Sequence, residues 1–466
     1  RSPVGKESLY ATQFKNLPIG QMEEKFADYG EVQIKQLNDR SKMYYTPNKE
    51  NNVFQLIVQY GAGEREFPNL GYAAQLMNNA GIMGAYEPQE LKEELSKLNA
   101  TCHVTADEDN LYIIMEGYEA TLPQACQLLS RQILMPKLDE KQLARLKGSA
   151  MGMRQQRKDN VSILNEALRQ YMLYGEKSDY IKELTDKEIY ELQISELTGD
   201  INRASNYEAK VFFTGTLPFD QVYDILSKNL PLVANERPSN SPQAKEMMPV
   251  TENTVYFLPN NDAEQAQIHL YIPMQKADKK DDVLRSAFNQ YFGLDFTGIV
   301  LNEIREKRSM AYTAYAFVGT QGIAGKASYL RGYIGTQNDK ANDALDVLMS
   351  LVNDMPKNPE RIGNIKSYLR QAMLTSHPSF RNKAMELVDL GYRGYTDDPA
   401  KENLPKVDAL TFDDIVKFYE ENIKGKPYCI SIMGNPKDID LKRLEKFGKV
   451  VKLNERKLFN TKDALF

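Results

Sequence analysis

Apolar and polar positions along the chain follow a pattern that predicts strands alternating with helices. Residues 52–60 form a largely apolar run that is typical of a buried strand. The Gly-Ala-Gly run at 61–63 ends this strand, and residues 70–79 then carry apolar side chains at helical spacing. Earlier in the chain, residues 32–37 and 43–45 flank a short polar turn composition, so we expect a β-hairpin there.

The same order of elements occurs twice. Residues 55–58 and the helix after them are matched by residues 267–270 and the next helix, and residues 211–215 are matched by residues 429–434. Thr185 and Thr411 also match, and each precedes acidic residues and an apolar run, which predicts the start of a helix. The separation is roughly 210–226 residues throughout, as expected for a duplicated domain. The pattern predicts an α+β fold of two duplicated lobes of about 200 residues, each a mostly antiparallel sheet with helices packed on one face.

Length and composition indicate where each lobe begins and ends. A chain of 466 residues is too long for a single core. Residues 236–252 are rich in Pro, Ser and Asn, a composition typical of a linker. We therefore predict a connecting arm at residues 1–30, a first lobe at 31–235, and a second lobe at 253–466.

Charge and cysteine content exclude some classes of function. A net charge of −5 leaves no basic excess with which to neutralise nucleic-acid phosphates. No apolar run approaches the roughly 18 residues of a membrane span. The cysteines at 102, 126 and 429 lie far apart in the sequence, and we expect them to be buried apolar residues. The chain starts at Arg1, which leaves its compartment open. We expect a soluble protein, periplasmic or secreted if a signal peptide precedes this sequence.

Residues 296–317 combine a helical pattern with candidate chemistry. Four apolar residues at its start recur at helical spacing, which puts them on one buried face of a helix: Phe296, Ile299, Val300 and Ile304. From Ala311 onward the residues favour a strand. Arg305 lies near the end of the predicted helix and Tyr312 at the start of the strand, so both could point into one cleft. A guanidinium and a phenol can both bind a carbonyl or carboxylate group. Taken alone, the stretch is better explained by a solvated charged face and a core tyrosine.

The wider sequence resembles the inverted zinc-peptidases, the family of pitrilysin, insulysin and mitochondrial processing peptidase. Leu301, Ile304, Arg305 and Tyr312 match the signature of its second domain at the expected spacing. The resemblance in order and spacing extends roughly from residue 31 to residue 440. It implies a half-clamshell in which Arg305 and Tyr312 reach across from the zinc-free half to bind substrate beside the metal of the other half.

Two neighbours of this pair could be mistaken for it. We expect Arg308 to be a solvated or salt-bridged surface residue. Tyr315 lies three residues after Tyr312, so in a regular strand the two side chains face opposite ways.

The zinc ligands of this family are missing from the chain. Members carry His-x-x-Glu-His on the first helix of the catalytic lobe, where the histidines bind zinc and the glutamate is the general base. Here Ala74, Met77 and Asn78 stand at those positions, and the later helix, expected at 143–158, contains no carboxylate for the remaining ligand. The matching helix of the second repeat carries other residues at these positions: Arg285, Phe288 and Asn289.

No other metal or catalytic site is apparent in the sequence. The three histidines, at 103, 269 and 377, have no further ligand at a chelating spacing. The resemblance therefore implies the non-catalytic, substrate-binding half of a zinc-dependent metalloendopeptidase that degrades peptides or unfolded polypeptides. It would hold no cofactor itself and would be inactive alone. Its partner, a zinc-bearing half, would lie upstream on the same polypeptide or be a separate subunit.

Two alternatives remain open from the sequence. The chain could be a structural or peptide-binding relative with no role in proteolysis, since a fold does not determine a function. It could also be an independent hydrolase with an unfamiliar site, although no set of ligands supports that hypothesis.

Overall fold

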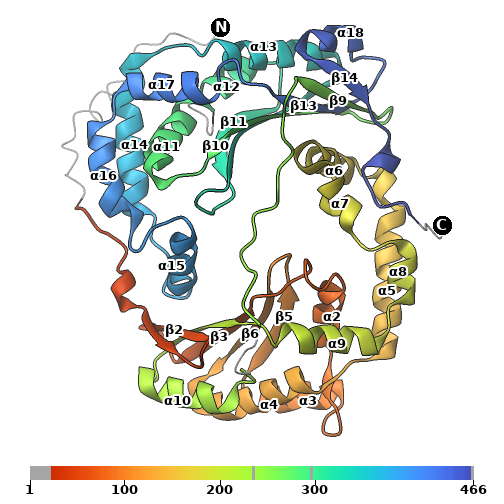
Figure 1. Cartoon of the computed structure of the whole chain (residues 1–466), viewed down its shortest axis with the longest axis vertical. Coiled ribbons are helices and arrows are strands. Elements are labelled where there is room, and N and C mark those ends of the chain that lie inside the picture. Colours follow the sequence, from red (N-terminus) through yellow and green to blue (C-terminus); the bar gives the residue numbers. More distant parts are fainter. Residues whose placement is uncertain (1–22, 233–236, 294–297, 463–466) are drawn as a thin grey trace, which may run out of the picture.

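The structure, a computed structural model, describes residues 23–232, 237–293 and 298–462. It contains two six-stranded sheets that face each other, with most helices on the outside (Figure 1). This arrangement confirms the predicted α+β fold of two duplicated lobes. Within the described ranges, no helix combines the length and apolarity needed to cross a bilayer.

The first sheet has the order β1-β2-β8-β3-β6-β5, and all of its neighbours are antiparallel except β2 and β8. Its strands are β1 (Gln33–Gln36), β2 (Lys42–Pro47), β3 (Val53–Tyr60), β5 (Thr101–Ala106), β6 (Leu111–Tyr118) and β8 (Ala209–Gly215). A separate two-stranded sheet pairs β4 (Gly81–Ile82) with β7 (Pro136–Lys137). The helices of this half are α2 (Leu70–Met77), α3 (Pro88–Lys97), α4 (Leu122–Leu134), α5 (Glu140–Gln155), α6 (Val161–Tyr174), α7 (Asp179–Lys182), α8 (Asp186–Glu191), α9 (Ile194–Ala204) and α10 (Phe219–Asn229).

The second sheet has the order β11-β12-β10-β13-β9-β14. Its strands are β9 (Thr254–Pro259), β10 (Gln265–Lys276), β11 (Thr313–Thr320), β12 (Ala327–Gln337), β13 (Cys429–Gly434) and β14 (Lys449–Lys452). The helices of this half are α11 (Asp282–Phe292), α12 (Ile299–Leu301), α13 (Ala341–Asn353), α14 (Ile362–Thr375), α15 (Lys383–Tyr392), α16 (Pro399–Ala409), α17 (Phe412–Asn422) and α18 (Leu441–Leu444).

Strand register shows that the two sheets are copies of one another. Gln55 on β3 lies opposite Thr214 on β8, and Gln267 on β10 lies opposite Met433 on β13. These are the residues that match between the sequence repeats, so the duplication extends to individual backbone pairs. The sheets differ at one edge, because β1 pairs antiparallel with β2 whereas β14 pairs parallel with β9.

The hairpin turn and the two helix starts predicted from local sequence are present in the structure. β1 and β2 make the expected hairpin, and the Asn38 side chain accepts hydrogen bonds from the backbone N–H groups of Arg40 and Ser41 in its turn. Thr185 and Thr411 each cap a helix through a reciprocal capping box. These signals are local, which is why the sequence alone identifies them.

Each half contributes a helix to the sheet of the other half. We call the side of a sheet that is turned away from its own lobe's helices its open face. Leu168 of α6 packs with Met433 on the open face of the second sheet. Ala384 of α15 packs with Ile57 and Phe212 on the open face of the first sheet. The sequence did not predict this exchange, and the proposed domain limits stay a prediction.

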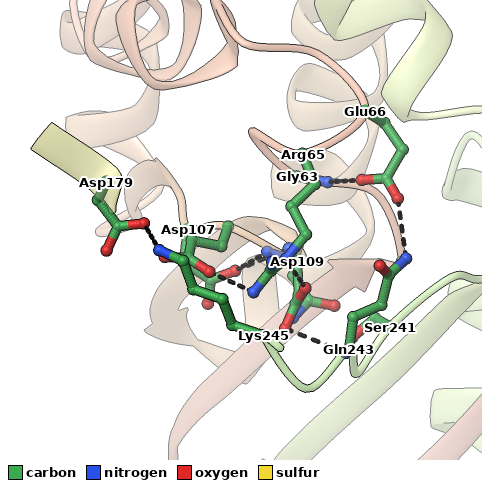
Figure 2. Close-up of polar contacts among 12 residues, drawn as sticks. Gly63, Arg65, Glu66, Asp107, Asp109, Asp179, Ser241, Gln243 and Lys245 are labelled. Atoms are coloured by element: carbon green, nitrogen blue, oxygen red, sulfur yellow. Dashed lines mark hydrogen bonds and ion pairs between the residues drawn. The ribbon is translucent and has the colours of Figure 1, made fainter. Parts of the chain in front are cut away.

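The segment after residue 236 runs between the two sheets (Figure 1). Figure 2 shows its polar contacts with the first half, and a further hydrogen bond joins it to the second half. The Lys245 ammonium forms an ion pair with Asp179 of α7, and the backbone N–H of Gln243 donates to Asp109 at 3.3 Å. From the second half, the side-chain amide of Gln321 donates to the carbonyl of Lys245 at 2.5 Å. The predicted linker is therefore held in place by specific contacts.

The described part of the predicted arm, residues 23–30, lies against the second half. Ala27 and Tyr29 pack with Leu390 and Tyr395 in a small apolar cluster. The backbone N–H of Ala27 donates to the Asp398 carboxylate at 2.6 Å. The arm thus connects the first sheet to helices α15 and α16.

Candidate substrate-binding residues and the altered metal-site helix

The stretch that carries Arg305 is helical but departs from a regular α-helix. After α12, residues 302–306 form a π-helical turn, in which the N–H of Lys307 donates to the carbonyl of Asn302 at 2.9 Å. Ser309, with φ of 50°, ends the turn in the left-handed region. Phe296, predicted to belong to the buried face, lies outside the described residues. The other three residues predicted for that face are buried: Ile299, Val300 and Ile304.

Arg305 is held less tightly by its neighbours than Arg308 is. The Arg305 side chain is 45% exposed, and its ion pair is a 3.5 Å contact with the adjacent Glu306. Exposed pairs of this kind contribute little and exchange easily. The Arg308 guanidinium instead donates to the carboxylate of Glu303 at 2.5 Å and to its backbone carbonyl at 2.6 Å. The prediction that Arg308 is a surface ion-pair residue is confirmed.

Tyr312 lies one residue before β11 and its side chain is 56% exposed. Its backbone N–H donates to Gly335, which anchors the residue at the end of the sheet. The side-chain amide of Gln337 donates to the Tyr312 hydroxyl at 3.4 Å, which leaves the hydroxyl proton free to donate to another acceptor. Among the described residues, no hydrogen bond joins Arg305 to Tyr312.

Helix α2, which stands where the zinc-binding helix would be, is built into the first core. Ala74 and Met77 are each 1% exposed, and neither offers a side-chain oxygen or nitrogen. The later helix, α5, begins at Glu140, so the prediction that it starts at residue 143 and contains no carboxylate was wrong. Within the described ranges, no three His, Cys, Asp or Glu side chains converge in a metal-binding group. The residues present therefore do not fit a zinc site of this family's kind.

Asn78, at the second histidine position, has a structural task. Its amide donates to the carbonyl of Val104 at 2.9 Å and accepts from the N–H of Val104 at 2.8 Å. Val104 lies on β5, the edge strand of the first sheet. Asn289 does the same in the second half, where it donates to the carbonyl of Val318 at 2.9 Å and accepts from its N–H at 2.6 Å.

We call this double hydrogen bond the asparagine clamp. In both halves it pairs the backbone of an edge strand, β5 or β11, with the helix that packs beside it. Unpaired backbone groups at a sheet edge are a site for adding another strand, and the clamp closes that site at one residue of each edge. The sequence held a signal for it, because asparagine recurs at the matching position of both repeats.

The three histidines lie in unlike environments. His103 and His377 are exposed. His269 is buried on the open face of the second sheet, where its Nε2 lies 3.0 Å from the side-chain oxygen of Asn165. Burial, together with the neighbouring Arg331 and Arg169, lowers the pKa of His269 to about 3, so this imidazole is neutral at physiological pH.

Comparison with known families decides the classification of the chain. Residues 205–365, which include Arg305 and Tyr312, match the family described as the peptidase M16 inactive domain. The match extends over about a third of the chain. The family predicted from the sequence, that of the inverted zinc-peptidases, is thereby confirmed.

Solved structures share the fold of this chain at low sequence identity. The peptidase M16 inactive domain from Pseudomonas fluorescens matches with a TM-score of 0.66 and 17% identity, over 88% of this chain and 99% of that one. A protease from Helicobacter pylori matches with a TM-score of 0.63 and 14% identity, over 86% and 99%. The periplasmic protease PqqL from Escherichia coli matches with a TM-score of 0.65 and 12% identity, over 91% and 50%. The sequence has no significant match among curated proteins.

Proposed function

We propose that this chain is the non-catalytic, substrate-binding half of a zinc-dependent metalloendopeptidase that degrades peptides or unfolded polypeptides. The observation that carries the proposal is the M16 inactive-domain match, because it spans the segment that contains Arg305 and Tyr312. The availability of both side chains supports it further, since each keeps hydrogen-bond donors that no neighbour fully occupies.

The pair would act on the substrate and not on a metal. The guanidinium of Arg305 and the hydroxyl of Tyr312 are donors suited to a peptide carbonyl and to the negative charge that develops on it during hydrolysis. Helix α2 supplies neither a zinc ligand nor a general base, so both would come from a zinc-bearing partner half. Zinc held there would supply the Lewis acid.

The lengths of the similar proteins allow either arrangement of the two halves. The chain spans about half of PqqL, but nearly all of the Helicobacter pylori protease. The zinc-bearing half would accordingly be an upstream part of the same polypeptide or a separate subunit. PqqL is a periplasmic protease, and by analogy we propose a periplasmic or secreted location for this chain.

Reconstitution tests the proposal. The chain would be mixed with a zinc-bearing His-x-x-Glu-His half encoded with it, and cleavage of an unfolded peptide would be followed over time. We expect little cleavage by either half alone and efficient cleavage by the mixture, because each half holds part of the site. If the zinc-bearing half is fully active alone, and the chain neither binds it nor alters its kinetics, the chain is instead a structural relative with no role in proteolysis.

A further inference from the structure

The open face of the second sheet carries aromatic side chains around one arginine. Strand register places Tyr315 beside Tyr333, and Phe317 beside Arg331 in the next row. The rings of Tyr315 and Tyr333 lie 5.3 Å apart, and the side chains of β12 on this face alternate with core residues on the other. Tyr315, Phe317, Arg331 and Tyr333 are only partly buried, and so is Tyr329 one row further on. This part of the open face is therefore accessible.

Within the described part of the chain, Arg331 has no anionic partner. Its Nε is buried without a hydrogen bond, and among the described residues no ion pair reaches its guanidinium. The carboxylate whose charge acts on Arg331 is that of Glu166 of α6, which already forms a two-point ion pair with Arg169. Glu166 therefore balances the charge of Arg169, and the neighbouring His269 is neutral, so none of these groups balances the charge of Arg331. Burial and the charge of Arg169 lower the pKa of Arg331.

An unpaired, partly buried cation is costly to keep in a folded protein. Apolar side chains of similar volume would fill this position at lower free energy. The aromatic rings around Arg331 can pack against its aliphatic stem, but they do not neutralise its charge. The site thus has an excess of one positive charge and flanking apolar surface, which is complementary to a carboxylate beside an apolar group.

The location of Arg331 relates it to the candidate pair. Phe317, beside Arg331, follows Tyr312 by five residues. Such an odd separation would put the two side chains on opposite faces of a regular strand. Tyr312, however, precedes β11, and its hydroxyl accepts a hydrogen bond from Gln337, which shares a face of β12 with Arg331. Five residues of strand span roughly 17 Å, which is also the length of five residues of extended peptide. A peptide whose backbone is held at Tyr312 could therefore lie along the open face and place a side chain at Arg331.

We propose that Arg331 and the surrounding Tyr315, Phe317, Tyr329 and Tyr333 form a substrate subsite that binds the carboxylate of an aspartate or glutamate side chain in the peptide. The aromatic rings contact apolar side chains next to that acid. The subsite rests on the proposed function, because it needs the chain to bind peptides, and it adds a preference for acidic residues at a fixed distance from Arg305 and Tyr312.

Paired peptides test the subsite on the intact chain. The probes are short, unstructured, fluorescently labelled peptides with amidated C-termini and one glutamate moved through successive positions, each matched by a peptide with glutamine there. Fluorescence anisotropy should show that glutamate at a subset of positions tightens binding by about tenfold or more over glutamine, because a charge-assisted hydrogen bond is gained. A peptide set without glutamate but with free C-termini shows whether a terminal carboxylate binds instead.

Arg331→Met removes the charge but keeps the apolar stem. We expect this variant to bind glutamate and glutamine peptides equally, whereas Arg308→Met, which also loses a guanidinium, should keep the preference. Arg331→Met should also raise the Tm by about 2 °C, because the uncompensated cation is gone, whereas loss of a structural arginine would lower it.

The outcomes separate this inference from the proposed function. If peptides bind without any glutamate preference, or if Arg331→Met keeps that preference, the subsite is wrong while substrate binding by this chain stands. A preference only for free C-termini would reassign Arg331 to terminal recognition and overturn the side-chain subsite. If no peptide binds at all, both proposals fail.

Discussion

Replacing Arg305 by alanine should strongly slow peptide cleavage by the assembled two-half enzyme, by about 10²–10³ in rate, as is typical when one transition-state donor is lost. Tyr312→Phe should act in the same direction, because it removes only the hydroxyl that no acceptor occupies. The zinc content of the partner half should not change, since neither residue is a ligand. Steady-state kinetics with metal analysis on the same preparations measures both quantities.

Arg308→Ala is the matched control for this experiment. Arg308 lies three residues from Arg305 and carries the same side chain, but its guanidinium is bonded to Glu303. We expect nearly unchanged kinetics from this variant, and little change in stability from any of the three, because truncating an exposed side chain leaves no core cavity. Equal and small effects of Arg305→Ala and Arg308→Ala would mean that the pair does not bind substrate.

Loss of an asparagine clamp should destabilise the fold by about 2–4 kcal/mol, since Asn78→Ala or Asn289→Ala each leaves a backbone donor and acceptor unpaired at a partly buried edge. Denaturant unfolding of the intact chain measures the effect. Asn261→Ala, at an exposed position, is the control and should change the free energy of unfolding by less than about 0.5 kcal/mol. If the clamp variants match this control, the recurrence of asparagine in both repeats has no structural basis.

The duplicated fold was predictable because its signals are periodic and local. Apolar runs identified β3 and β10, helical spacing identified α2 and α11, and threonines at positions 185 and 411 identified helix starts. The exchange of α6 and α15 between the halves was not predictable. An amphipathic helix shows which of its faces is apolar, but nothing in its pattern says which of two similar sheets it covers.

The candidate residues were predicted unevenly. The family signature selected Arg305 and Tyr312, and the structure leaves both available, while their role in binding substrate stays a prediction. The π-helical turn at residues 302–306 could not be anticipated, because those residues also suit a regular helix. Asn78 was interpreted only as a lost zinc ligand. Comparison of one position with a family pattern shows that the histidine is missing, but it does not show what the asparagine does instead.

Arg331 had no sequence signal at all. It is one arginine in a strand, and its lack of a partner depends on α6, more than 150 residues earlier in the chain, whose Glu166 is already bonded to Arg169. Only the packing of α6 beside the open face of the second sheet reveals the unbalanced charge. A charged side chain without a partner results from contacts between distant segments, and neither periodicity nor sequence motifs predict such contacts.

The central claim is that this chain is the half that does not perform the chemistry. Zinc content and peptide cleavage, measured together on the isolated chain after purification without chelators, test it most directly. We predict no stoichiometric zinc and no cleavage, because Ala74 and Met77 of α2 are core residues without ligand atoms and Asn78 is bonded to Val104. One zinc per chain, with peptidase activity that rises and falls with the metal content, would contradict the account.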